Sequence, residues 1–440
     1  MAKRLVEAAS KETRDHLPAR ESIVRNIKNW EAGKHRPKDP YPKLYARAFG
    51  LDEAIIFDAS PNELVGVVVA DPGLPWVWEP GPIVSAIYDM TRSDLMLDRR
   101  QAIRALSITA GLPLIDPVQR WLAKTSEELP ATSQAGRIGV DELARLETTA
   151  DVFRTWGDSQ GGGLARKAVI GQLNEVADLL RDSHPRDITV RLFHVMAKLA
   201  KIAATMSWDC GMQTAAQKYY ILALQAAKPA KDWTFGASVL ASMARQLLYL
   251  DRPQDALELV RLALDGVQAA GTHRVRAMLH TREAWAYAAL GRPEAFRRAT
   301  DKAEDAFGEI RTSDLDPEWI TYFDAAELAG VTGGRYLEMS RRNGQYAAVA
   351  VTHIGRALEL RRRTSMRSLA LDQVGLAQAH LRNGDLDEAV TVGSAAADTA
   401  GQVQSDRVRV QLRELHAEIA ARREPVMAGL SERIRETLAG

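Results

Sequence analysis

The chain has 440 residues, of which 46% are hydrophobic and 26% charged, with 58 Lys and Arg against 57 Asp and Glu. These values exclude a chain that is disordered throughout, and the length corresponds to two or three folded units. A single cysteine, Cys210, excludes an intramolecular disulfide and a cysteine-based zinc finger. No secretory signal opens the chain and no window offers the ~20 apolar residues of a membrane span, so we expect a cytoplasmic protein that makes no membrane contact.

Basic residues are concentrated at the N-terminal end. Residues 1–50 contain twelve Lys or Arg and six Asp or Glu, a net charge of +6 that leaves −5 for the other 390 residues. A small basic unit joined to a large, weakly acidic body is typical of a protein whose one end meets a polyanion.

Three sections follow one another along the chain. Residues 1–57 carry short helical patterns, and residues 58–162 begin with a Pro-, Gly- and Trp-rich stretch that predicts a linker before an intermediate helical region. The glycines of residues 157–163 predict a flexible joint. In residues 163–440, Ala-rich amphipathic patterns of about 12–18 residues alternate with short turns, and no strand-like alternation persists. We therefore expect an all-α fold.

The segment from Arg20 to Ala32 predicts a helix with two different faces. Four apolar side chains recur on one side, at the spacing that buries a stripe: Ile23, Val24, Ile27 and Trp30. The opposite side carries residue types that read bases, since Arg pairs with guanine and Asn with adenine in the major groove. These base-reading candidates are Ser22, Arg25, Asn26 and Asn29. The candidates for phosphate contacts are Lys28, Lys34, Arg36 and Lys38.

The sequence that ends this helix resembles a known family. Trp30-Glu31-Ala32-Gly33, followed by Pro37, Tyr41 and Leu44, is similar to the second half of a Cro/repressor-type (XRE family) helix-turn-helix domain. The order of segments along the chain, including residues 91–100 after the linker, resembles a large group of actinobacterial transcriptional regulators. The resemblance implies that residues 1–57 bind double-stranded DNA. One such unit makes few contacts, so we expect a homodimer over two half-sites.

One helix of the family's domain has no counterpart in this sequence. Two helices precede the recognition helix in the family, whereas only residues 2–11 offer a helical pattern before the turn at residues 12–18. This N-terminally incomplete domain has two interpretations. Either the coding sequence starts upstream of Met1, or the DNA-binding unit is degraded.

Residues 163–440 contain a recurring pattern of helix pairs. A small residue in a first helix is followed by a turn with Gly or Asp, and then by small residues in a second helix. Four copies contain Ala204, Gly211 and Ala216; Ala244, Asp251 and Ala256; Ala284, Gly291 and Ala303; and Ala377, Gly384 and Ala389. A further copy, with Gly344 and Ala350, fits less well. These positions resemble the tetratricopeptide pattern, but the spacings Ala216 to Ala256, Ala256 to Phe296 and Ala350 to Ala389 are 40, 40 and 39 residues instead of about 34. The sequence thus predicts a tetratricopeptide-like α-solenoid, with a non-repetitive helical bundle as the alternative.

The resemblance to tetratricopeptide proteins implies a binding groove lined by the first helix of each pair. The corresponding positions in this chain are Lys198, Lys201, Thr205, Arg245, Tyr249, Trp285, Gln378 and Arg382. Their basic and aromatic character favours a peptide or protein ligand with acidic or carboxylate groups. The Asn of the carboxylate-clamp subtype is absent from these positions, which disfavours that particular mode of binding.

Motifs of catalysis are absent from the sequence. It contains no Gly-x-Ser-x-Gly elbow, no His-Glu-x-x-His and no phosphate-binding loop, and its nine histidines show no metal-ligand spacing. Trp319, Tyr322 and Phe323 recur at a helical spacing that is typical of core packing, with a ligand site as the alternative for the first two. We therefore expect no enzyme, no cofactor and no metal site.

Together these features predict a DNA-binding transcriptional regulator with a helical-repeat domain for sensing or dimerisation. The alternative is a protein-interaction adaptor of tetratricopeptide type whose DNA-binding head is non-functional.

Overall fold

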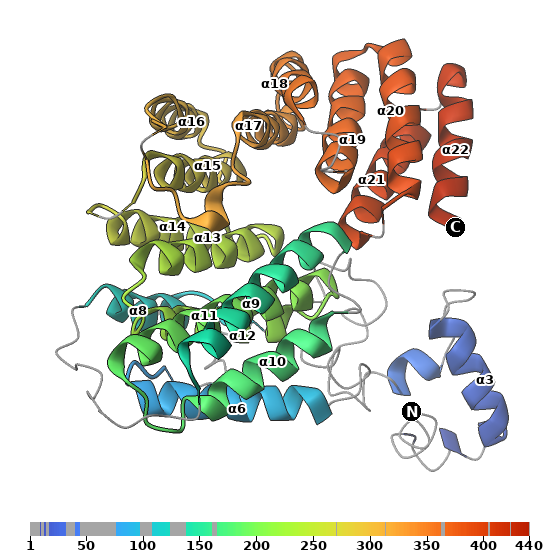
Figure 1. The fold of residues 1–440 in the computed structure, drawn as a ribbon. Coiled ribbons are helices and arrows are strands. Elements are labelled where there is room, and N and C mark those ends of the chain that lie inside the picture. Colours follow the sequence, from blue (N-terminus) through green and yellow to red (C-terminus); the bar gives the residue numbers. More distant parts are fainter. Residues whose placement is uncertain are drawn as a thin grey trace. The chain divides into compact units, whose positions relative to one another are not determined.

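The computed structural model describes most of the chain. The described residues are 9, 13–14, 17–31, 40–44, 76–96, 108–123, 138–160, 165–269, 271–312, 314–361, 366–403, 405–422 and 424–439. Two compact units are present, Met1–Gly66 and Val67–Gly440. The regular elements of the described residues are helices, which confirms the predicted all-α class (Figure 1).

The first unit contains α3 (Arg20–Glu31), which packs into a small core. Ile23 and Ile27 on α3 are buried together with Ala9, Tyr41 and Leu44. The expectation that Val24 belongs to the same buried stripe is wrong, because its side chain is 40% exposed. Ile23 and Ile27 attach α3 to this core without Val24, because residues four apart lie on the same face of a helix.

The second unit contains the other helices whose full bounds the structure describes. In chain order they are α6 (Pro80–Met96), α8 (Leu112–Leu122), α9 (Val140–Gln160), α10 (Arg166–Leu179), α11 (Arg186–Asp209), α12 (Gln213–Ala227), α13 (Trp233–Tyr249), α14 (Pro253–Gly266), α15 (His273–Ala289), α16 (Pro293–Gly308), α17 (Ala325–Ser340), α18 (Tyr346–Leu360), α19 (Met366–Asn383), α20 (Leu386–Gly401), α21 (Asp406–Arg422) and α22 (Ala428–Ala439). Short 3-10 turns occur at Glu318–Ile320 and Pro425–Met427. Residues 157–160 were expected in a flexible joint, but they form the last turn of α9.

From α11 onward, consecutive helices form antiparallel pairs. Each of the pairs α11 with α12, α13 with α14, α15 with α16, α17 with α18, and α19 with α20 packs along its length, and each pair contacts the next. Figure 1 shows the pairs following one another through the second unit, with α21 and α22 completing the series beside α19 and α20.

The turns inside these pairs follow from a recurring local sequence. Gly211, Asp251, Gly291 and Gly384 adopt positive φ angles of 76°, 55°, 67° and 94° just after a first helix. The next residue's N–H then bonds the carbonyl five residues back, as in Met212 to Ser207 at 2.9 Å. This is the Schellman ending of a helix, which favours Gly because a left-handed residue with a Cβ is strained.

Small side chains allow the paired helices to approach closely. Ala204, Ala244 and Ala284 occupy the same place in three successive first helices, and each is 3% exposed or less. Ala216 and Ala256, in the facing second helices, are fully buried. The recurrence of these residues every 40 positions therefore reflects a repeated packing contact.

Helices from residues 58–162 pack onto the array of pairs. α6 lies against α10 and α12, α8 against α14, and α9 against α11. In the first contact, a buried cluster ties α6 to the array: the Arg166 guanidinium bonds Asp94, which also accepts a hydrogen bond from the Tyr219 hydroxyl at 2.8 Å. In the second, the Trp121 side chain of α8 is fully buried against two glycines, Gly236 and Gly266.

Candidate functional site

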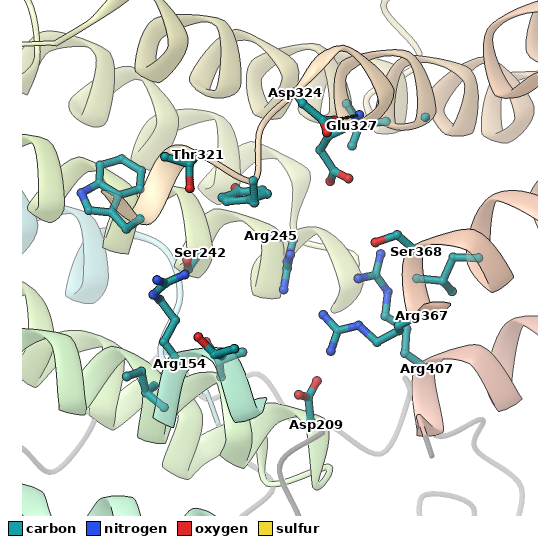
Figure 2. Close-up of a pocket in the computed structure, with 18 of the residues that line it drawn as sticks. Arg154, Asp209, Ser242, Arg245, Thr321, Asp324, Glu327, Arg367, Ser368 and Arg407 are labelled. Atoms are coloured by element: carbon teal, nitrogen blue, oxygen red, sulfur yellow. Dashed lines mark hydrogen bonds between the residues drawn. The ribbon is translucent and has the colours of Figure 1, made fainter. Parts of the chain in front are cut away.

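The second unit forms an open cavity of about 1270 Å³. Its walls come from α9, α11, α13, α17, α19 and α21, together with residues 317–324 between α16 and α17. These elements are far apart in the sequence, so the cavity exists only because the helix pairs curve around it. Figure 2 shows Arg245, Arg367 and Arg407 pointing into this space from different helices, with Asp209 on the opposite side.

Five of the eight predicted groove residues line the cavity: Lys198, Lys201, Thr205, Arg245 and Gln378. Lys198 lies 3.3 Å from the Asp151 carboxylate. Lys201 donates to the Ser238 hydroxyl at 2.8 Å, and its ammonium lies over the rings of Phe235 and Trp319.

The other three predicted groove residues lie behind or beside the cavity wall. Tyr249 and Trp285 form an edge-to-face contact with ring centroids 5.2 Å apart, and Trp285 is only 7% exposed. Arg382 connects helices, since it bonds the Glu418 carboxylate on α21 and the Leu337 carbonyl on α17.

Trp208, Tyr249 and Trp285 form a continuous aromatic row behind the cavity wall, because Trp208 also packs edge-to-face on Tyr249 at 5.2 Å. An arginine lies over each ring. The guanidinium carbon is 4.6 Å from the ring centroid for Arg245 on Trp208, 5.4 Å for Arg407 on Tyr249, and 3.7 Å for Arg335 on Trp285. Such stacking holds a guanidinium by cation–π attraction and leaves its N–H edges available for hydrogen bonds.

A fourth arginine, Arg282, lies in the same region and is 5% exposed. It borders a small pocket next to the cavity, together with Arg245 and Tyr322. Burial lowers the pKa of Arg282 and also that of Arg335. Burial by itself would raise the pKa of the Tyr249 hydroxyl, but the positive charges of Arg407, Arg335 and Arg245 bring it below its ordinary value. The region therefore has a strongly positive local potential.

Carboxylates compensate this charge only in part. Arg335 donates to Glu338 at 2.9 Å. Within the described part of the chain, no carboxylate lies within ion-pair distance of Arg245, Arg282 or Arg407. By contrast, the cavity wall near α9 is internally neutralised, since Arg154 pairs with Glu318 at 3.0 Å and Lys198 with Asp151 at 3.3 Å.

The connection between α16 and α17 brings aromatic residues to the cavity. Asp316 anchors it by accepting hydrogen bonds from Arg274 and from the Thr272 hydroxyl, both at 2.6 Å. Phe323 is then fully buried, whereas Trp319 and the half-exposed Tyr322 line the cavity. Core packing, as predicted from the sequence, thus describes Phe323. Trp319 and Tyr322 lie in the cavity wall, where a ligand would contact them.

Sequence patterns missed three of the four arginines. Arg282 lies one helical turn before the mapped position Trp285, Arg335 is in the helix pair that fits the repeat pattern least well, and Arg407 follows the last mapped copy. Arginine recurs in α15 and α21, but Arg335 is the single arginine of α17, so composition offered a signal for Arg282 and Arg407 alone. Their convergence depends on the curvature of the array, which residue spacing alone does not encode.

The candidate DNA-contacting residues lie in the first unit. Arg25 is exposed, and Ser22 and Asn26 are half-buried on α3. Lys28 and Asn29 belong to the same helix, but their side chains lie outside the described residues, as do Lys34, Arg36 and Lys38. The structure thus places Ser22, Arg25 and Asn26 along one helix whose Ile23 and Ile27 face the core.

No three His, Cys, Asp or Glu side chains gather to hold a metal ion in the described ranges. Among the helices that the structure describes, none has the length and apolar character needed to cross a membrane. Comparison with protein-family models, with curated proteins and with solved structures found no match to this chain.

Proposed function

We propose that the protein is a DNA-binding transcriptional regulator of the XRE type, with a tetratricopeptide-like array that senses a peptide or protein ligand. The observation that carries the proposal is the packing of α3. Ile23 and Ile27 are held in a core with Tyr41 and Leu44, while Arg25 is exposed. A base-reading helix needs this division, because its buried face fixes the helix and its free face enters the major groove.

The charge distribution supports the same proposal. The excess of basic residues lies within residues 1–50, the section that contains α3. Phosphate contacts supply most of the affinity for DNA, and Arg and Asn side chains on the exposed face supply base preference. A single small unit makes few contacts, so we propose that a homodimer binds two half-sites.

The array supports the sensing role. Its helix pairs, their Schellman turns and the 40-residue recurrence of small buried residues are consistent with tetratricopeptide-like repeats with longer helices. The cavity of about 1270 Å³ offers the array a place to bind a ligand. Ligand binding then alters operator affinity if the ligand binds better to one relative placement of the two DNA-binding heads in the dimer.

Genome-wide DNA capture tests the DNA-binding role. We compare the native protein with an Arg25→Ala/Asn29→Ala variant and with an Arg356→Ala control, which removes an exposed arginine of α18 in the second unit. The expected result is a set of discrete sites for the native protein and the control that the double variant loses. Capture of no discrete sites by the native protein contradicts the proposal and favours the adaptor with a non-functional head.

A further inference from the structure

Arg245, Arg282, Arg335 and Arg407, which we call the arginine cluster, come from four different helices. Arg245, Arg335 and Arg407 line the cavity, and Arg282 borders the small pocket beside it together with Arg245. Glu338 pairs with one of them, and the described residues place no carboxylate within ion-pair distance of the other three. The Nε atoms of Arg245 and Arg407 are buried without a hydrogen-bond partner. Arg282 is 5% exposed and hydrogen-bonds the Tyr322 hydroxyl.

Like charges that are partly removed from water repel one another and lose hydration. A protein tolerates such a cluster when a ligand supplies the missing negative charge. Two further features favour an anion at this place. The first turns of α19 and α21 border the cavity, and helix N-termini carry partial positive charge. The aromatic row also fixes three of the guanidiniums in place before any ligand arrives.

We propose that the arginine cluster binds neighbouring carboxylates of an acidic peptide that lies extended in the cavity. This inference rests on the proposed ligand-binding role of the array and is independent of DNA binding. The guanidinium edges that stacking leaves free match the two oxygens of a carboxylate.

The rest of the cavity fits a peptide better than a compact polyphosphate. Its volume of about 1270 Å³ exceeds the roughly 300–1,000 Å³ of most small-molecule sites. Ser242, Gln378, Gln402 and Gln411 along the walls are suited to hydrogen bonds with a peptide main chain. Asp324 and Glu327 also face the cavity (Figure 2), where their carboxylate oxygens offer acceptors for main-chain N–H groups.

The test is a selection from random dodecapeptides with the full-length protein, followed by calorimetric measurement of the enriched sequences. An Arg245→Gln/Arg407→Gln variant removes half of the cluster. The matched control, Arg154→Gln, removes an arginine from the same cavity that is neutralised by Glu318. Circular dichroism confirms that each protein is folded. Should the double variant unfold, Arg245→Lys keeps the charge and removes the bidentate edge.

We expect the selected peptides to carry two or more acidic residues within four positions, and to lose affinity when Gln replaces Glu. Their Kd should rise about tenfold or more in the double variant, and clearly in Arg245→Lys, while Arg154→Gln changes it less than about twofold. Three results overturn the inference: no enriched peptides, enriched peptides without acidic residues, or acidic peptides that bind both variants as tightly as the native protein.

Pyrophosphate and ATP are measured in the same way, and tight binding of either at the cluster with exclusion of acidic peptides also overturns the inference. Failure here is distinguishable from failure of the proposed function. A protein that captures DNA sites but binds no acidic peptide refutes only the ligand class. A protein that binds acidic peptides but no DNA refutes only the regulator.

Discussion

Two kinds of buried arginine occur in this protein, and they differ in how their charge is balanced. Arg166 is paired with a carboxylate, since it bonds Asp94, and it also donates to the Ser207 hydroxyl at 2.8 Å. Arg245 lies on the Trp208 ring with its Nε unpartnered. The first arginine holds elements of the fold together, whereas the second is positioned for a partner outside the chain.

Because of this contrast, we expect the same Arg→Gln substitution to lower the free energy of unfolding strongly at Arg166 and only slightly at Arg245. Arg166→Gln leaves the Asp94 carboxylate buried without its counter-charge, so we expect it to lower the free energy of unfolding by about 3–5 kcal/mol. Arg245→Gln relieves repulsion from neighbouring arginines and loses one cation–π contact, so we expect a change of less than about 1 kcal/mol. Chemical denaturation of the two variants measures both values. A cost for Arg245→Gln as large as that for Arg166→Gln would show that Arg245 is a structural residue.

At the scale of single residues, sequence reasoning identified side-chain types more reliably than their partners. Lys198, Lys201, Arg245 and Gln378 were predicted from repeat positions and do line the cavity. Tyr249 was predicted by the same rule but packs behind the wall, because its neighbours Trp208 and Trp285 draw it into the aromatic row. Long-range neighbours of this kind are set by tertiary packing, which spacing in one helix does not reveal.

The helices are connected by a few specific contacts, and the junction of α17, α18 and α19 depends on one arginine. Arg361 follows α18 and bonds Glu327 on α17 at 3.0 Å and Asp372 on α19 at 2.6 Å. Burial raises the pKa of Asp372 to about 6 despite the opposing effect of Arg361. The junction is therefore sensitive to pH.

We expect stability to fall as the pH rises from about 4 to about 6, relative to an Asp372→Asn variant. In this window the folded protein retains a proton on Asp372 that the unfolded chain releases, so a rising pH favours unfolding. The difference in unfolding free energy between the two proteins should change by roughly 2–3 kcal/mol and level off above about pH 7. Urea unfolding across this range provides the measurement, and parallel pH profiles for the two proteins would contradict the assignment.

Docking of α8 depends on the absence of side chains at two helix positions. A Cβ built on Gly266 would lie 2.6 Å from the buried Trp121 ring. We expect Gly266→Ala to destabilise the protein by about 1–3 kcal/mol, through overpacking. Gly355→Ala is the matched control, since it has open space in the middle of α18 and should stabilise by about 0.5–1 kcal/mol.

A double-mutant cycle checks the cause of this effect. If Gly266→Ala acts through the Trp121 ring, its cost should largely disappear in a Trp121→Ala background. An equal cost in both backgrounds would mean that the helix backbone, rather than α8 docking, is affected.

At the scale of elements, the helix pairs were largely predictable from the sequence. The packing of other helices, such as α8, onto these pairs was not. Gly211, Gly291 and Gly384 mark turns because glycine adopts a positive φ without strain, and buried alanines recur at a fixed distance from them. The contact of α8 with Gly236 and Gly266 joins positions more than a hundred residues apart, so no local sequence pattern predicts it.

At the scale of the whole molecule, two chemically different surfaces lie on one chain. The first unit exposes Arg25 on α3, and the second unit forms a cavity that three members of the arginine cluster line. Composition predicted a basic N-terminal unit on a weakly acidic body, and periodicity predicted that the body is all-α. Repeat positions predicted a basic groove that includes Arg245, but neither net charge nor residue spacing indicated that Arg282, Arg335 and Arg407 lie in the same region.

In the proposed function, DNA binding by the first unit responds to ligand binding by the second. The most direct test is the affinity for a captured DNA site, measured by fluorescence anisotropy without peptide and with a saturating acidic peptide from the selection. We expect the Kd for DNA to change by about fivefold or more in the native protein and to stay constant in Arg245→Gln/Arg407→Gln. An unchanged Kd in the native protein, with the peptide demonstrably bound, would contradict the account.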